Sequence, residues 1–217
     1  MDKIIDLEKK YNLFVIEDAA QAIDSYYMNR DGINHPLVSI GHVASFSFHM
    51  SKNIILGEVG MFDGNDEKYI ERAEIICGKG TNRSFFFRGE IDKYGWVDIG
   101  SSFLMSDINA AFLWAQLETF DFIQNDRLLI WNYYSNELKE WSVKNGINLP
   151  KIPHYVSNNT HMFYMCTNSN EQRNKIFSHL KKENINSVFR YVSLHKSELY
   201  MKIGAIQTSL KKNRFLC

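Results

Sequence analysis

The sequence predicts an α/β protein, in which short apolar strands alternate with amphipathic helices. Two apolar runs, residues 13–16 and 42–48, are short and rich in β-forming residues, and polar residues follow each of them. Residues 66–76 and 106–118 have helical periodicity, with Asp66 and either Ser106 or Asp107 as N-caps. Because ligands of open α/β sheets gather outside the carboxyl ends of strands, the polar residues after each run are candidates for a site.

The first part of the chain contains three further predicted segments. We expect an amphipathic helix over residues 2–11 and a turn followed by a third short strand from residue 57. Residues 79–105 are rich in glycine and aromatic residues without clear periodicity, which is typical of functional or intersubunit segments. In the helix over residues 106–118, we expect Ile108, Leu113 and Trp114 to face the core.

The second part of the chain has the pattern of a small α+β domain. It predicts a long helix over residues 121–144, a strand over 161–167, a helix over 170–183 and a strand over 187–192. We therefore predict the later part of a large domain over residues 1–125 and a partial small domain over 126–217. The first good strand already carries candidate site residues and residues 202–217 lack a core pattern, so we expect the chain to be incomplete at both ends.

The composition excludes several classes of function. Hydrophobic residues make up 45% of the 217 residues, which is ordinary for a globular protein, and the 25 Lys and Arg balance the 25 Asp and Glu. No basic patch indicates a nucleic-acid partner. No apolar run approaches the roughly 18 residues that span a bilayer, and the start has no signal-peptide core. The three cysteines form no disulfide framework, and the dispersed histidines have no metal-ligand spacing. We expect a cytoplasmic protein without a metal or membrane partner.

The candidate chemistry lies at the ends of the two predicted strands. Lys52 follows the second strand, whereas Asp18 follows the first. An amine that can bind an aldehyde and a carboxylate that can face a ring nitrogen are what pyridoxal phosphate needs from a protein. Ser47 could donate its hydroxyl to the cofactor phosphate, and Gln21 could reach the ring. The alternatives are that Asp18 caps a helix, Ser47 points into the sheet and Gln21 is an ordinary helix residue.

These residues resemble the DegT/DnrJ family of sugar-nucleotide aminotransferases, within the aspartate-aminotransferase superfamily. The family's E-D-x-A-Q/H motif matches Glu17-Asp18-Ala19-Ala20-Gln21, and its S-F-x-x-x-K motif matches Ser47-Phe48-His49-Met50-Ser51-Lys52. Residues 80–84, 87–89, 92–94 and 98–107 are similar to one subgroup, the TDP-4-oxo-6-deoxyglucose transaminases that form TDP-4-amino-4,6-dideoxygalactose. In this order and spacing the motifs are specific.

The resemblance implies a fold, a reaction and partners. The fold would be an aspartate-aminotransferase-like large domain, incomplete at its N-terminus, with part of a small α+β domain. Lys52 would be the catalytic residue and, with Asp18, Gln21 and Ser47, would hold pyridoxal 5′-phosphate. Related dehydratases carry His in place of this lysine, so Lys52 favours transamination. The amino donor would be glutamate and the acceptor a nucleotide-linked 4-keto-6-deoxy sugar, in surface polysaccharide or antigen biosynthesis (lipopolysaccharide or enterobacterial common antigen).

Three points stay open from the sequence. The chain could be a truncated, inactive remnant of such an enzyme, or an enzyme that aminates C3 instead of C4. The family also implies a homodimer in which each site borrows residues from its neighbour. Arg83, Arg88 and Lys93 could bind the nucleotide diphosphate, contact the partner subunit or be plain surface charges.

Overall fold

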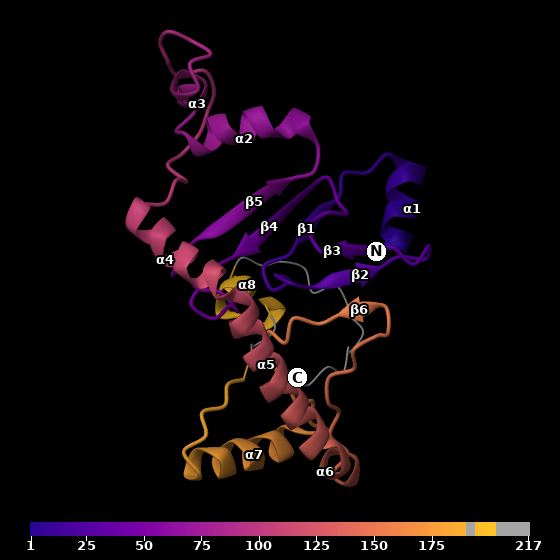
Figure 1. Cartoon of the computed structure of the whole chain (residues 1–217). Helices are drawn as coiled ribbons and strands as arrows, with labels where there is room; N and C mark the ends of the chain where they lie inside the picture. Colours follow the sequence, from indigo (N-terminus) through magenta and orange to yellow (C-terminus); the bar gives the residue numbers. More distant parts are fainter. Residues whose placement is uncertain (190–193, 203–217) are drawn as a thin grey trace. The chain divides into compact units, whose positions relative to one another are not determined.

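The protein consists of two compact units in a computed structural model that describes residues 1–189 and 194–202 (Figure 1). Unit 1 comprises Met1–Ile130 and Ile152–His161, and unit 2 comprises Trp131–Lys151 and Met162–Cys217. The chain combines helices with a sheet that contains a parallel strand pair, and the predicted α/β class is confirmed. The domain boundary expected after residue 125 falls inside helix α5 (Phe120–Glu137) and stays a prediction.

The first sheet of unit 1 has the strand order β1 (Ile16–Asp18), β4 (Val43–Ser47) and β5 (Gly60–Gly64). Strands β1 and β4 are parallel, with Asp18 opposite Ser45, and β5 runs antiparallel to β4. The strand expected over residues 13–16 is wrong in position, because β1 begins only at Ile16. Before that point Val15 O accepts a main-chain hydrogen bond from His42 N at 2.9 Å, but Val15 N donates to the His42 side chain, at Nδ1, at 3.1 Å, and the Phe14 ring stacks on His42.

A second, smaller sheet in unit 1 was missed by the sequence analysis. It has the order β3-β2-β6, formed by Asn34–Pro36, Tyr26–Met28 and Val156–Ser157, and all of its pairings are antiparallel. Its strands are two or three residues long, and β6 lies more than 100 residues after β2 and β3 in the sequence. Such short strands carry too few residues for an alternation pattern to be recognised.

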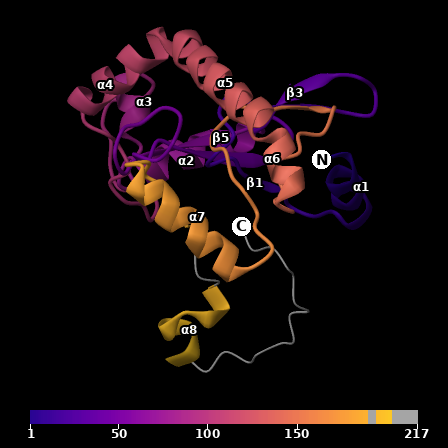
Figure 2. The same cartoon turned by 90° about the horizontal axis from the view of Figure 1, so that it is seen from below.

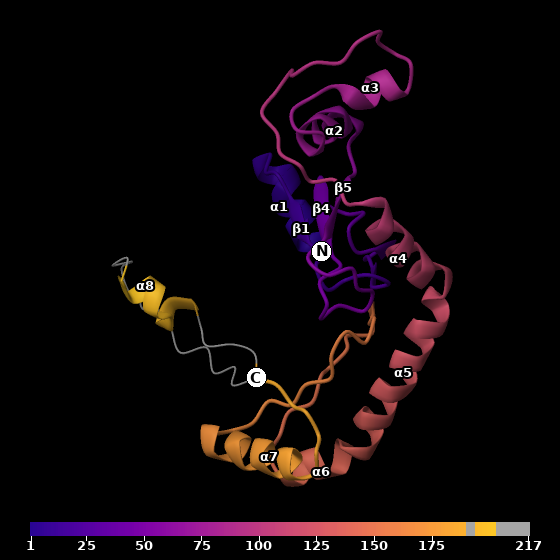
Figure 3. The ribbon, with the colours of Figure 1, turned by 90° about the vertical axis from the view of Figure 1, so that its left-hand side faces the viewer.

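The helices of unit 1 begin where the sequence places their caps. Asp66 accepts a hydrogen bond from Lys68 N, and Ser106 accepts one from Asn109 N at 3.3 Å. In Figure 3, α1 and α4 lie on opposite sides of the first sheet. The elements are α1 (Asp2–Tyr11), η1 (Glu67–Tyr69), α2 (Ile70–Cys77), α3 (Arg83–Phe87), α4 (Asp107–Glu118) and the first part of α5. The expected irregular segment 79–105 therefore contains one short helix.

The core of unit 1 lies beside the loop that follows β4. Phe48, Ile54 and Leu56 of this loop pack with Leu113 of α4, and Ile54 is 1% exposed. Leu113 is the only buried residue of α4. Trp114 is 64% exposed, so the apolar face expected for this helix is wrong except at Leu113. The loop after β4 is therefore a fixed part of the fold.

Unit 2 is helical in its described part (Figure 2). The helix expected over residues 121–144 is interrupted at Leu138, which separates α5 from α6 (Lys139–Lys144). Helix α7 (Asn170–Lys182) confirms the next prediction, with Ser169 as its N-cap, and η2 (Leu194–Lys196) and α8 (Glu198–Lys202) follow. Trp131 of α5 contacts the ring of Phe163 edge-on.

Two strands predicted in unit 2 do not form as expected. The strand over residues 161–167 is wrong, because this segment makes only one isolated bridge, between Asn148 and Cys166. Its main chain has no continuous partner strand among residues 1–189 and 194–202, and its apolar side chains make contacts such as that of Phe163 with Trp131. Of the strand expected over 187–192, residues 187–189 have no regular structure and the others lie outside the described residues.

Some sequence expectations concern cysteines, metals and membranes. The sequence predicts no disulfide framework; Cys77 is a free thiol, whereas Cys166 is disulfide-bonded. Among the described residues, no cluster of three or more His, Cys, Asp and Glu could hold a metal ion. None of the helices in this part of the chain combines the length and apolar character needed to cross a bilayer.

Candidate active site

Asp18 and Ser47 lie on one face of the first sheet, at the carboxyl ends of two neighbouring parallel strands. Asp18 ends β1 opposite Ser45, and Ser47 ends β4 two residues further on. Because side chains alternate along a strand, Asp18, Ser45 and Ser47 point to the same side. Ile16 on this face is 68% exposed, so the face is open to solvent. The expectation that strand ends bring these two residues together fits this arrangement.

Asp18 does not cap a helix. Its carboxylate Oδ1 accepts a hydrogen bond from Ala20 N at 3.1 Å, and the residues that follow form a turn. One carboxylate oxygen is thus held by the main chain, which fixes the direction in which the other can point. Gln21 lies in the same turn with an exposed side chain, and its carbonyl oxygen accepts a hydrogen bond from Asn159 Nδ2 at 2.7 Å.

Lys52 lies in a closed loop directly after β4. Its main-chain N donates to His49 O at 2.9 Å, and Leu56 N donates to Phe48 O at 2.6 Å. Gly57 has a φ of 84°, a left-handed conformation that glycine adopts without strain and that ends the loop. The Lys52 side chain is half-buried, and its Nζ has no hydrogen bond or ion pair to the residues that the structure describes. Its amine is thus available to react.

The acid next to Asp18 has a different role, which the sequence analysis did not predict. Glu17 points to the core side of the sheet and is 9% exposed. Its carboxylate accepts main-chain hydrogen bonds from Val38 N at 3.2 Å, from Ile40 N at 2.8 Å and from Gly41 N. A Cβ on Gly41 would stand 3.1 Å from Glu17 Cγ, so any larger residue would press on the Glu17 side chain. Glu17 is therefore a structural anchor for the loop before β4.

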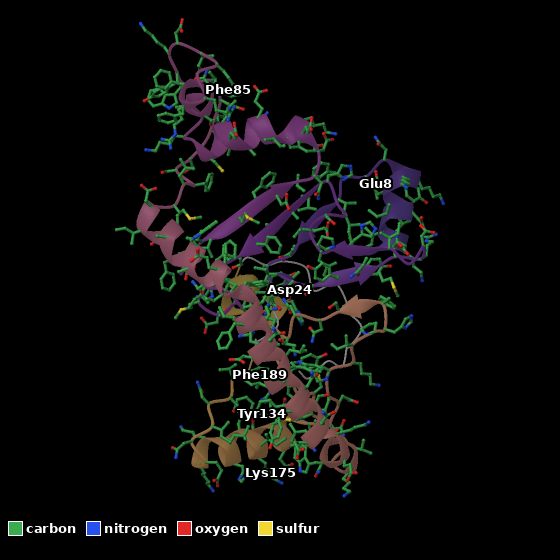
Figure 4. The ribbon with its side chains drawn as sticks, in the orientation of Figure 1. Glu8, Asp24, Phe85, Tyr134, Lys175 and Phe189 are labelled. Carbon is green, nitrogen blue, oxygen red and sulfur yellow. The ribbon has the colours of Figure 1, made fainter. Side chains whose placement is uncertain are left out.

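The three predicted substrate-binding residues lie in or beside the segment 79–105. Arg83 begins α3, which Figure 1 shows beyond α2 from the sheet. Arg88 pairs with Glu74 at 3.0 Å and with Glu90 at 2.7 Å, and its guanidinium lies over the ring of Phe85, which is labelled in Figure 4. Hydrogen bonds to Glu90 and Glu74 raise the pKa of Arg88. Lys93 is exposed. Of these cations, Arg88 is already engaged by two carboxylates.

Sequence reasoning also missed a set of buried amide side chains next to Lys52. Asn53, Gln124 and Asn159 are hydrogen-bonded to one another although they lie far apart in the sequence. The adjacency of Asn53 to Lys52 was the only available signal.

Comparison with known proteins identifies the fold and the family. Residues 1–214 match the model of the DegT/DnrJ/EryC1/StrS aminotransferase family. The chain belongs to this family. Its homologues and structural neighbours in this family are aminotransferases that depend on pyridoxal phosphate. The predicted aspartate-aminotransferase-like fold is confirmed.

Three similar proteins illustrate the match. GDP-perosamine synthase of Caulobacter vibrioides is 30% identical over 167 residues, which cover 77% of this chain and 40% of that protein. A DegT/DnrJ/EryC1/StrS aminotransferase from Brucella abortus is 26% identical with a TM-score of 0.74, over 92% of this chain and 48% of that one. A structure titled putative sugar aminotransferase, from Streptococcus pneumoniae in its PLP form, is 24% identical with a TM-score of 0.71. The match covers 91% of this chain and 49% of that one. The chain spans about half the length of such relatives.

Proposed function

We propose that this chain carries the reactive lysine of a pyridoxal-phosphate-dependent aminotransferase that acts on a nucleotide-linked 4-keto-6-deoxy sugar. One observation carries the proposal: Asp18 and Ser47 share an open face at the ends of parallel strands β1 and β4, and Lys52 follows β4 in a closed loop. The donor set fits the cofactor, since it combines a carboxylate, a hydroxyl and an available amine.

Each residue has a distinct role in this proposal. Lys52 Nζ binds the cofactor aldehyde and later moves a proton from the Cα of the amino donor. Asp18 keeps the ring nitrogen protonated, Ser47 donates to the phosphate, and Gln21 borders the ring. When bound, pyridoxal phosphate supplies an electron sink for the carbanion that forms next to the amine.

The substrate, pathway and assembly are further parts of the proposal. We infer a nucleotide sugar as the acceptor, glutamate as the donor, and a place in surface polysaccharide or antigen biosynthesis, in the cytoplasm. A relative named GDP-perosamine synthase supports the sugar class. Arg83 and Lys93 are proposed to meet the diphosphate, and Arg88 to do so only after leaving Glu74 and Glu90. A homodimer is supported by exposed apolar side chains in the segment 79–105, such as Trp96 at 84% and Ile99 at 89%.

The proposal is tested by chemical trapping on the purified chain. We expect the chain mixed with pyridoxal phosphate to become covalently labelled after borohydride reduction, with the label on the peptide that contains Lys52. With glutamate, the same protein is expected to release 2-oxoglutarate, and amination of 4-keto and 3-keto nucleotide sugars compared side by side fixes the acceptor position. Absence of both label and 2-oxoglutarate would reject the function.

Asp18→Asn is expected to lower turnover on the order of 10²-fold without changing the fold, because the amide keeps the contact to Ala20 N but cannot stabilise a protonated ring nitrogen. The measurement is 2-oxoglutarate formation together with thermal unfolding. Asp63→Asn is the matched control, since Asp63 pairs with Ala44 and so lies on the opposite face of the same sheet. Equal effects of the two substitutions would contradict the assignment of Asp18.

A further inference from the structure

Three buried amide residues form a connected hydrogen-bond network in unit 1, in which Asn53 and Gln124 reach Asn159 through its main-chain carbonyl oxygen. Asn53, Gln124 and Asn159 are 7%, 8% and 4% exposed. Asn53 Nδ2 donates to Gln124 Oε1 at 2.9 Å and to the carbonyl oxygen of Asn159 at 2.8 Å. These contacts join the residue next to Lys52 to α5 and to the segment before residue 161, at sequence separations of 71 and 106 residues.

The far end of the network holds the turn that follows Asp18. Asn159 Nδ2 donates to the carbonyl oxygens of Gln21 and Ile23, at 2.7 Å each. Gln124 Nε2 donates to the carboxylate of Asp24 at 3.1 Å, and Figure 4 labels this residue. The same three amides therefore touch both loops that carry the candidate site residues.

The network is closed, because each amide uses both of its ends. The two Nδ2 hydrogens of Asn53 have two acceptors, and its Oδ1 lies 2.9 Å from His161 Nδ1. Since an amide oxygen only accepts, His161 carries its proton on Nδ1 in this contact. Asn159 Oδ1 likewise accepts from His161 N at 3.1 Å. A fully satisfied buried network is rigid, and loss of the Gln124 side chain would leave both Asn53 and Asp24 without this partner.

A second set of hydrogen bonds holds the loop of Lys52 from helix α4. Gln116 of α4 accepts a hydrogen bond from Ile55 N at 3.0 Å and donates one to Ile55 O at 2.7 Å. Within three residues of Lys52, the loop is thus held by α4 through the main chain of Ile55 and by α5 through the side chain of Asn53. The polar contacts of this loop define its position, whereas the Lys52 side chain itself stays unpaired among the described residues.

We propose that Asn53, Gln124 and Asn159 are positioning residues, which lock the loop of Lys52 in register with the turn after Asp18. The inference rests on the proposed function for its purpose, but the coupling of the two loops is measurable without any cofactor. For the Lys52 amine to react with an aldehyde on a ring that Asp18 holds, the amine and the carboxylate must be at fixed positions relative to each other. A network that spans both loops fixes these positions.

The first experiment measures hydrogen exchange in the cofactor-free full chain. We expect Gln124→Ala to raise exchange on the order of 10-fold in both segments, 48–56 and 19–25, because the Gln124 side chain contacts Asn53 in the first and Asp24 in the second, and its removal leaves both without this partner. Asn65→Ala is the control: Asn65 Nδ2 also donates to two carbonyl oxygens, those of Val38 and Gly41, but touches neither loop. Exchange that rises in one segment only, or equally in the control, would overturn the coupling.

The second experiment separates positioning from general stability. Asn53→Ala, Asn159→Ala and the control Asn65→Ala are compared at a temperature where all of them are folded. We expect Asn53→Ala and Asn159→Ala to lose covalently bound cofactor on dialysis about 10-fold faster than Asn65→Ala, even where their melting temperatures fall by the same amount. Unchanged retention in both variants would overturn the positioning role while leaving the proposed function intact. A wild-type chain that takes no label on Lys52 would reject the proposed function, and the exchange data then decide the coupling by themselves.

Discussion

Lys52→Arg is expected to abolish transamination, with 2-oxoglutarate formation from glutamate falling by roughly 10⁴-fold. Arginine keeps the positive charge and nearly the length of lysine, but its guanidinium does not lose a proton in proteins, so it can neither bind an aldehyde nor carry a proton. The folding of the loop depends on main-chain contacts of Lys52 and on Asn53, which the substitution leaves in place.

The control for Lys52→Arg is the same exchange at Lys9, an exposed residue of α1. We expect Lys9→Arg to match the wild type in turnover and in labelling after borohydride reduction. The decisive comparison uses both assays, since Lys52→Arg should lose label and turnover together at an unchanged melting temperature. A Lys52→Arg variant that still transaminates would show that another amine does the chemistry.

Glu17→Ala is expected to lower the free energy of unfolding by about 3 kcal/mol or more, because three main-chain N–H groups around residues 38–41 lose a charged acceptor in a buried place. This would be the largest effect on stability among the substitutions considered. Val38, one of the three donors, has a φ of 105°, a costly conformation for a β-branched residue, which the contact with Glu17 helps to maintain.

Denaturant unfolding of the wild type, Glu17→Ala and Glu17→Gln measures this effect. Glutamine retains one oxygen that can accept from Ile40 N and Gly41 N, but it places its amide NH2 group next to Val38 N. The free energy of unfolding of Glu17→Gln should therefore lie between those of the wild type and Glu17→Ala. Glu67→Ala, at an exposed position in η1, should change little. If Glu17→Ala is as stable as Glu67→Ala, the anchoring role is wrong.

The local part of the candidate site could be predicted from sequence, because Asp18, Ser47 and Lys52 each lie at or just after the end of a recognisable strand. Parallel pairing of those strands then brings their ends together. The caps at Asp66 and Ser106 were equally local, since each serves an amide two or three residues away. Whether Gln21 contacts a cofactor remains a prediction.

What sequence could not predict depends on partners far along the chain. Asn53 meets Gln124 and Asn159 across 71 and 106 residues, and no local pattern encodes such a contact. The segment 161–167 has the composition of a strand, but a strand also needs a neighbour for its main chain, and only Cys166 bridges to another segment. Trp114 has the spacing of a core residue, yet nothing in the described part of the chain covers it.

The dipeptide Glu17-Asp18 places two carboxylates on opposite sides of one short strand. Glu17 binds the main chain of the loop before β4, whereas Asp18 lies on the solvent-exposed face of the sheet. Sliding β1 past β4 by a single position would interchange them, presenting the anchor to solvent and pushing the other acid against the interior. Inserting or deleting one residue ahead of Ile16 should therefore lower stability and activity more than most point substitutions, because the same shift in register displaces both Glu17 and Asp18.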